Sequence, residues 1–126
     1  SYFHESLSER KYNLNLDSMW INFMKKQEFN PEHVHGSFLS FVLYLEVPNV
    51  LHQENSQNET TSGGAGSIDF NYGEPAPGCI TTQNILPENG DLLIFPSSLR
   101  HFVYPFQSDV IRTSVSGNFS LVFYDD

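Results

Sequence analysis

Residues 38–47 are the feature that most limits how this chain can fold. They read FLSFVLYLEV, which is almost continuously apolar, and Pro48 follows directly. A strand with one face in water would alternate apolar and polar residues, so an unbroken apolar run is typical of a strand buried on both faces. Proline ends the pairing because it has no N–H group to donate. We therefore expect a central strand here.

Short β segments separated by turn residues make up most of the chain after Glu28. Strands are predicted where β-branched and aromatic residues concentrate, at 67–72, 79–86, 91–95, 101–106, 110–116 and 119–124. Turns are predicted at 74–78, 87–90, 96–98, 107–109 and 117–118. With the central strand and one ending near His35 this makes about eight strands, which predicts an all-β sandwich or small barrel. Residues 17–26 fit either a short helix capped by Asp17 or an edge strand.

The length and the charge of the chain limit the number of domains it can form and the kinds of partner it can bind. The chain has 126 residues, and its 39% hydrophobic content with 11 Phe and 6 Tyr can fill one core, so a single domain over 1–126 is expected. The net charge is −9 and the six Lys and Arg are scattered, which argues against a nucleic-acid partner.

Residues 49–66 are polar and end in Gly-Gly-Ala-Gly, which predicts a long mobile loop that could cover a site.

The lone cysteine bears on the compartment. Cys79 cannot form an intramolecular disulfide, so the fold does not need an oxidising environment, and a cytoplasmic location is expected. Its place at the start of a predicted strand favours a small core residue. The chain has no apolar run long enough to span a bilayer, so no membrane partner is expected.

Three histidines are candidates for a metal site. His33 and His35 are two residues apart, so on an extended segment both imidazoles point to the same face. His101, at the start of a later strand, qualifies as a third ligand. Three protein ligands leave coordination positions open, as catalysis requires. The alternative is that these are ordinary histidines at strand ends. His4 and His52 lie in polar surroundings and are assigned no role.

Arg112 and Ser114 are candidates for an anion site. They share one face of a predicted strand, so a guanidinium and a hydroxyl can converge on one carboxylate. A buried arginine without a partner would be costly, so an acidic small molecule would suit it. The alternative is a surface ion pair with one of the 15 Asp and Glu residues.

These motifs, in this order, resemble a family of 2-oxoglutarate and Fe(II)-dependent oxygenases found in bacteria and marine phages. The resemblance runs from about Trp20 to Asn118 and rests on NPEHVH, LSFVLYL, GDLLIFPS, HFVYP and RTSVSGN. It implies a double-stranded β-helix, the jelly roll shared with cupins. It also implies Fe(II), 2-oxoglutarate as cosubstrate, dioxygen and an unidentified prime substrate, with succinate and carbon dioxide as products.

The resemblance also implies roles for particular residues. His33 and His101 correspond to iron ligands, and Arg112 with Ser114 corresponds to the clamp on the distal carboxylate of 2-oxoglutarate. Asn22, Tyr44 and Asn118 are further candidates for hydrogen bonds to the cosubstrate.

His35 departs from the superfamily, which generally has a carboxylate at that place. A neutral imidazole there would leave the site one unit more positive. A three-histidine site, a two-histidine site with water, and a carboxylate from another residue all stay open. Glu32 is the weaker candidate for that carboxylate because it should face away from His33 on a strand.

Two rival functions also stay open. A cupin-type metal dioxygenase with three histidine ligands would use the same fold and a His-x-His pair. A non-catalytic jelly-roll module for binding or virion structure would need no metal, because a fold alone does not fix function.

Overall fold

The computed structural model of the chain describes residues 10–60 and 63–124. Over these residues the chain is mostly β, with eight strands and one helix. In chain order they are β1 (Tyr12–Met24), β2 (Asn30–His33), β3 (Leu39–Glu46), α2 (Asn49–Ser56), β4 (Ile68–Asn71), β5 (Thr82–Ile85), β6 (Leu92–Pro96), β7 (Arg100–Val103) and β8 (Arg112–Phe123).

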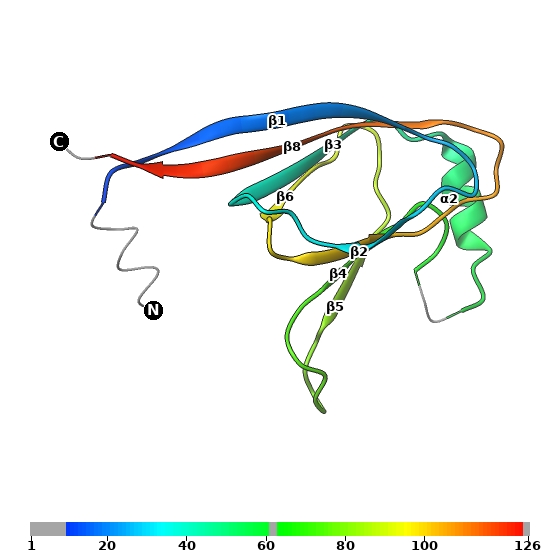
Figure 1. Cartoon of the computed structure of the whole chain (residues 1–126). Coiled ribbons are helices and arrows are strands. Elements are labelled where there is room, and N and C mark those ends of the chain that lie inside the picture. Colours follow the sequence, from blue (N-terminus) through cyan, green and yellow to red (C-terminus); the bar gives the residue numbers. More distant parts are fainter. Residues whose placement is uncertain (1–9, 61–62, 125–126) are drawn as a thin grey trace.

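The strands form two antiparallel four-stranded sheets that face each other. One sheet, here called sheet A, has the order β1-β8-β3-β6, and the other, sheet B, has the order β2-β7-β4-β5. Figure 1 shows sheet A above sheet B, with α2 beside one end of the pair. The chain crosses repeatedly between the sheets, because β3 pairs with β6 and β8 whereas β4 pairs with β5 and β7. The predicted jelly roll is confirmed.

β3 is an interior strand of sheet A, as its apolar sequence predicted. It lies between β8 and β6, and Ser40, Val42 and Tyr44 on its inner face are buried. The prediction of burial on both faces is wrong, because the residues between them are only half-buried. The described core packs between the sheets and consists of Val42, Tyr44, Val47, Leu51, Ile68, Phe70, Phe95, Val103 and Phe106.

Residues 17–26, for which the sequence allowed a helix or an edge strand, belong mostly to a strand. β1 forms an edge of sheet A and pairs with β8 along its length, from Tyr12 opposite Phe123 to Met24 opposite Arg112. Residues 17–26 therefore contribute to a β edge and not to a helix. Because side chains alternate on a strand, Trp20, Asn22 and Met24 share one face of β1, and all three are among the residues that line the interior cavity.

The predicted turn at 117–118 is wrong, because β8 runs unbroken from Arg112 to Phe123. Gly117 lies opposite Met19 on one side and Phe41 on the other. A β-carbon at this position would collide with the ring of Phe41 and with the backbone oxygen of Ser18. The glycine therefore allows close packing in the middle of a strand.

The predicted mobile loop at 49–66 is largely ordered. Residues 49–56 form α2, whose Leu51 is buried, and residues 61–62 lie outside the described residues. Glu54 accepts hydrogen bonds from the backbone N–H groups of Gln107 and Ser108 and from the Ser108 hydroxyl. Contacts with a distant segment thus order a stretch whose own composition is too polar to do so.

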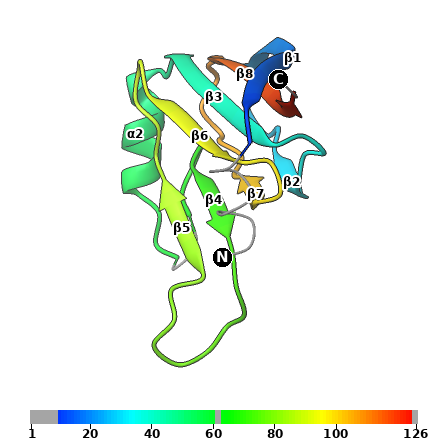
Figure 2. The same cartoon turned by 90° about the vertical axis from the view of Figure 1, so that its left-hand side faces the viewer.

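Cys79 is exposed, which contradicts the core role expected of it. It lies in the loop between β4 and β5, and β5 begins only at Thr82. Figure 2 shows this loop projecting from the body of the molecule. In the described part of the chain, no helix has the length and apolar character needed to cross a membrane.

Candidate metal centre

His33, His35 and His101 come together between the two sheets, at the rim of sheet B. His33 ends β2 and lies opposite His101 of β7, while His35 follows two residues later with its backbone N–H bonded to the Ser97 oxygen at 2.8 Å. One ligand nitrogen from each ring lies within 4.8 Å of the others. The sequence prediction that the three histidines share a site agrees with this geometry.

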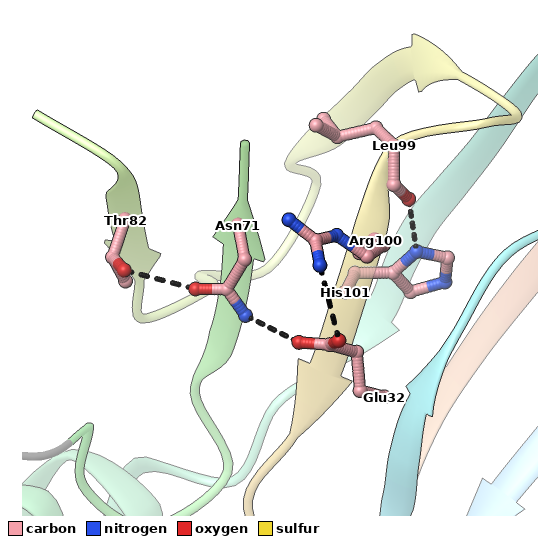
Figure 3. Close-up of polar contacts among 6 residues, drawn as sticks. All are labelled: Glu32, Asn71, Thr82, Leu99, Arg100 and His101. Carbon is pink, nitrogen blue, oxygen red and sulfur yellow. Dashed lines mark hydrogen bonds and ion pairs between the residues drawn. The ribbon is translucent and has the colours of Figure 1, made fainter. Parts of the chain in front are cut away.

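Backbone carbonyls fix which ring nitrogens can bind a metal. The Nδ1 atom of His33 lies 2.7 Å from the Pro31 oxygen. The Nδ1 atom of His101 lies 2.9 Å from the Leu99 oxygen, a contact that Figure 3 shows. A carbonyl can only accept, so each Nδ1 carries the proton and each Nε2 keeps a free lone pair. Metal-binding histidines are typically oriented in this way.

The spacing of the His35 and His101 nitrogens fits one metal ion. The Nε2 atoms of His35 and His101 are 3.3 Å apart. Two nitrogens bound to one metal at about 2.1 Å are about 3.0–3.4 Å apart, depending on the coordination geometry. Imidazole donors suit iron, zinc, copper and nickel. The three residues therefore fit a transition metal.

Burial keeps two of these histidines neutral. It lowers the pKa of His35 and of His101, and the neighbouring histidines lower both pKa values further. The hydrogen bond of His101 to Leu99 acts in the opposite direction on its pKa but does not reverse the shift. Only a neutral imidazole can bind a metal, so the environment favours the form that a ligand needs.

A cavity of about 360 Å³ connects the histidines with β8. A volume of this size can hold a small ligand. Aromatic and aliphatic side chains share its wall with a similar number of polar residues, which include Glu28, Asn30 and Ser40 as well as the three histidines. Among the residues that line it are Trp20, Asn22, Phe23, Met24, Phe29, Phe41, Val42, Tyr44, Ile68, Phe95, Val103, Arg112 and Ser114.

Arg112 lines this cavity as a buried guanidinium without an acidic partner. Its side chain is only 5% exposed, and among the described residues no carboxylate forms an ion pair with it. Nη1 donates to the Gly66 oxygen, Nη2 lies 3.2 Å from the Met24 sulfur, and the Tyr44 ring centre lies 5.3 Å from Cζ.

The nitrogen Nε of Arg112 has no hydrogen-bond partner. Burial lowers the pKa of Arg112 from its ordinary value, although Tyr44 acts against that shift. Even so, arginine stays charged in proteins. The alternative of a surface ion pair is thus wrong, and the wall of the cavity carries a positive charge that an anion could neutralise.

Ser114, Asn22 and Tyr44 line the same cavity as Arg112, and their contacts with a cosubstrate stay a prediction. Ser114 is buried two residues along β8, and Asn22 lies opposite it on β1. The Asn22 amide nitrogen is 3.5 Å from the Ser114 hydroxyl and 2.9 Å from that of Ser116. The buried Tyr44 belongs to the neighbouring β3, opposite Ser114.

Asn118 does not line the cavity. Its side-chain oxygen accepts from Ser40 at 2.7 Å, and its nitrogen donates to Ser18 at 3.2 Å. Those bonds occupy the amide between strands of sheet A. His52 lies on α2 outside the cavity lining, and His4 lies outside the described residues.

Glu32 points away from the histidines. Its carboxylate contacts Asn71 and Arg100 on the other face of sheet B (Figure 3), and over residues 10–60 and 63–124 no carboxylate joins the three-histidine cluster.

Sequence reasoning missed Trp20 and Met24, which line the cavity beside Asn22. The alternation of β1 would have placed them there if the helix alternative had been set aside.

The comparisons with known proteins agree with the fold and the donor set. Residues 18–118 match the family described as "Putative 2OG-Fe(II) oxygenase", where 2OG denotes 2-oxoglutarate. The match covers most of the chain, so the chain belongs to this family. The resemblance to these oxygenases is thereby confirmed, while a bacterial or phage source stays a prediction.

One solved structure is similar in fold. It is the crystal structure of an oxidoreductase of the 2OG-Fe(II) oxygenase family from Burkholderia pseudomallei, with a TM-score of 0.59 and 18% identity. The match covers 88% of this chain but 46% of that chain, so this chain spans less than half the length of the protein it matches. No curated protein matches the chain.

Proposed function

We propose that the chain is a single catalytic domain of an Fe(II)- and 2-oxoglutarate-dependent dioxygenase that hydroxylates an unidentified substrate. The observation that carries the proposal is the buried Arg112, which has no acidic partner over residues 10–60 and 63–124 and shares one cavity with three histidines. Family membership supports the same activity. Neither a buried cation nor a histidine cluster alone would favour this reaction over others.

His33, His35 and His101 would hold the iron through nitrogen atoms. When bound there, iron supplies the activation of dioxygen that is coupled to conversion of 2-oxoglutarate into succinate and carbon dioxide. All three ligands are neutral, so the charge of the metal is not reduced by the protein. A ferrous site of this kind attracts the dianionic cosubstrate more strongly than one with a carboxylate ligand.

Arg112 and Ser114 would bind the distal carboxylate of 2-oxoglutarate. The guanidinium can exchange its contacts with Gly66 and Met24 for two charge-assisted hydrogen bonds to a carboxylate. The Ser114 hydroxyl adds a third donor on the same strand face. Tyr44 and Asn22 complete the polar end of the cavity, and its aromatic walls limit the access of water to the reacting groups.

One alternative function is favoured by a specific observation. Because no carboxylate joins the three histidines among the described residues, the donor set also fits a cupin-type metal dioxygenase that needs no keto acid. Such an enzyme would have no need for Arg112 in the wall of the cavity. The requirement for 2-oxoglutarate therefore separates the two functions.

Anaerobic titration tests the proposal. Apoprotein is titrated with Fe(II) and then with 2-oxoglutarate, while the visible absorption of a keto acid chelated to ferrous iron is followed. We expect a band that requires both components and that succinate cannot produce. Iron binding without this band would favour the cupin-type alternative, and absence of iron binding would favour a non-catalytic jelly roll.

A further inference from the structure

A chain of polar side chains crosses the outer face of sheet B directly behind the histidines. It consists of Glu32, Arg100, Asn71 and Thr82, one residue from each strand of the sheet, and is called the outer network below. Asn71 donates to Glu32 at 2.9 Å, Thr82 donates to Asn71 at 2.9 Å, and Arg100 lies 4.0 Å from Glu32 (Figure 3).

The outer network and the metal centre occupy opposite faces of the same part of the sheet. Glu32 precedes His33 on β2, and Arg100 precedes His101 on β7. Adjacent residues on a strand point to opposite faces, so each histidine that faces inward has a network member beside it that faces outward. On the next strand, β4, Asn71 lies opposite Arg100 while Phe70 lies opposite His101.

β2 has few other interactions to hold it in place. It is a four-residue strand at the edge of sheet B, so it pairs only with β7. Its pairing has an irregularity between Asn30 and His33, and Pro31 cannot donate a backbone hydrogen bond. The Glu32 carboxylate extends past β7 to Asn71 of β4 and so connects the edge strand to the interior of the sheet.

The outer network should contribute little to stability. The side chains of Glu32 and Arg100 are 46% and 52% exposed. Exposed ion pairs contribute little to folding because solvent screens them. A metal ligand, in contrast, must be held to within a fraction of an ångström, and groups that orient ligands affect affinity strongly. Such a network is therefore expected to affect the distance between His33 and His101 more than the stability of the fold.

We propose that the outer network positions His33 against His101, and so sets the geometry of the metal centre from the opposite face of the sheet. The inference rests on the proposed function only in requiring that these histidines bind a metal. Glu32, Arg100 and Asn71 are positioning residues and do not contact the metal themselves.

Co(II) titration of three variants tests the proposal. Asn71→Ala breaks the connection between β2 and β4 without a change of charge. Arg100→Gln removes a positive charge near the site, so through-space electrostatics alone would tighten cation binding, whereas loss of positioning would weaken it. Arg100→Lys keeps the charge and should largely restore affinity. Asp109→Asn is the matched control, because it removes the exposed ion pair with Lys26.

We expect Asn71→Ala and Arg100→Gln to bind Co(II) about 10-fold more weakly or worse, with altered visible spectra of bound Co(II). Their apoproteins should unfold at the same temperature as Asp109→Asn. Unchanged affinity and spectra, tighter binding by Arg100→Gln, or affinity lost only in proportion to apoprotein stability would each overturn the inference while leaving the proposed function intact. If wild-type protein bound no Co(II) or Fe(II), the proposed function itself would fail.

Discussion

Replacement of Arg112 by methionine should weaken cosubstrate binding by about 10²–10³-fold without unfolding the protein. This guanidinium is buried, has no acidic partner among the described residues, and has one nitrogen without any hydrogen bond. Methionine has a similar length and no charge, so it can fill the same space. The usual expectation that loss of a buried side chain destabilises a protein should therefore not hold here.

Two opposing contributions set the change in the free energy of unfolding. Replacement of a buried charge by an apolar side chain of similar volume is often neutral or stabilising by about 1–4 kcal/mol. Against this, the Gly66 oxygen loses its hydrogen bond from Arg112, which costs about 1–3 kcal/mol if no water replaces it. We expect a net change of at most about 3 kcal/mol in either direction. Leu51→Ala, which truncates a buried neutral side chain, should lose about 2–5 kcal/mol.

Binding of 2-oxoglutarate should respond very differently. Removal of one partner from a buried, hydrogen-bonded charge pair costs about 3–4 kcal/mol, which corresponds to a factor of about 10²–10³ in Kd. Urea unfolding of the apoprotein measures the first quantity, and anaerobic calorimetry of 2-oxoglutarate with Co(II)-loaded protein measures the second. A variant that lost several kcal/mol of stability but kept its affinity would refute the reasoning, because Arg112 would then be a structural residue.

Three further predictions concern single side chains. His101→Ala should abolish Co(II) binding in equilibrium dialysis. The same measurement on His35→Ala decides between a three-histidine and a two-histidine site, because full Co(II) affinity in that variant would show that His35 is not a ligand. Ser114→Ala should weaken 2-oxoglutarate binding by about 10-fold, because one hydrogen bond to a charged group is worth about 1.5 kcal/mol; the same calorimetry would contradict this if affinity were unchanged. Burial acts to raise the pKa of Glu54, but hydrogen bonds from Ser108 and Gln107 lower it overall, so the stabilising effect of this carboxylate is present at neutral pH and is lost as pH falls through the lowered folded-state pKa. Glu54→Gln should therefore be less stable than wild type at pH 7 and equal to it near pH 2. A stability difference that does not change with pH in urea unfolding would disprove the assignment.

The parts of the site that the sequence predicted depend on local geometry. Because side chains alternate on a strand, Arg112 and Ser114 had to share a face wherever their strand lay. The same argument brought His33 and His35 together, although β2 ends at His33 and His35 lies just beyond it. The central position of residues 38–47 also followed from their composition. These inferences needed no knowledge of which strands pair.

The parts that the sequence did not predict depend on contacts between distant residues. Gly117 was taken for a turn because the ring of Phe41, which occupies the space a side chain would need, is 76 residues away in sequence. Polar residues 49–56 form a helix because Glu54 binds a segment more than 50 residues further on. That Arg112 has no acidic partner in the described part of the chain is likewise a property of the packed molecule.

The two halves of the proposed site belong to different sheets. Arg112 and Ser114 lie on sheet A, whereas His33 and His101 lie on sheet B. A ligand held at both ends must therefore span the fixed distance between the two sheets, so the fold would select dicarboxylates by their length. Succinate has the same distal carboxylate as 2-oxoglutarate, but its other carboxylate has no adjacent keto group with which to chelate a metal through two atoms. The product would keep its attachment to sheet A and be held more weakly at sheet B, so the architecture would favour its departure after each turnover.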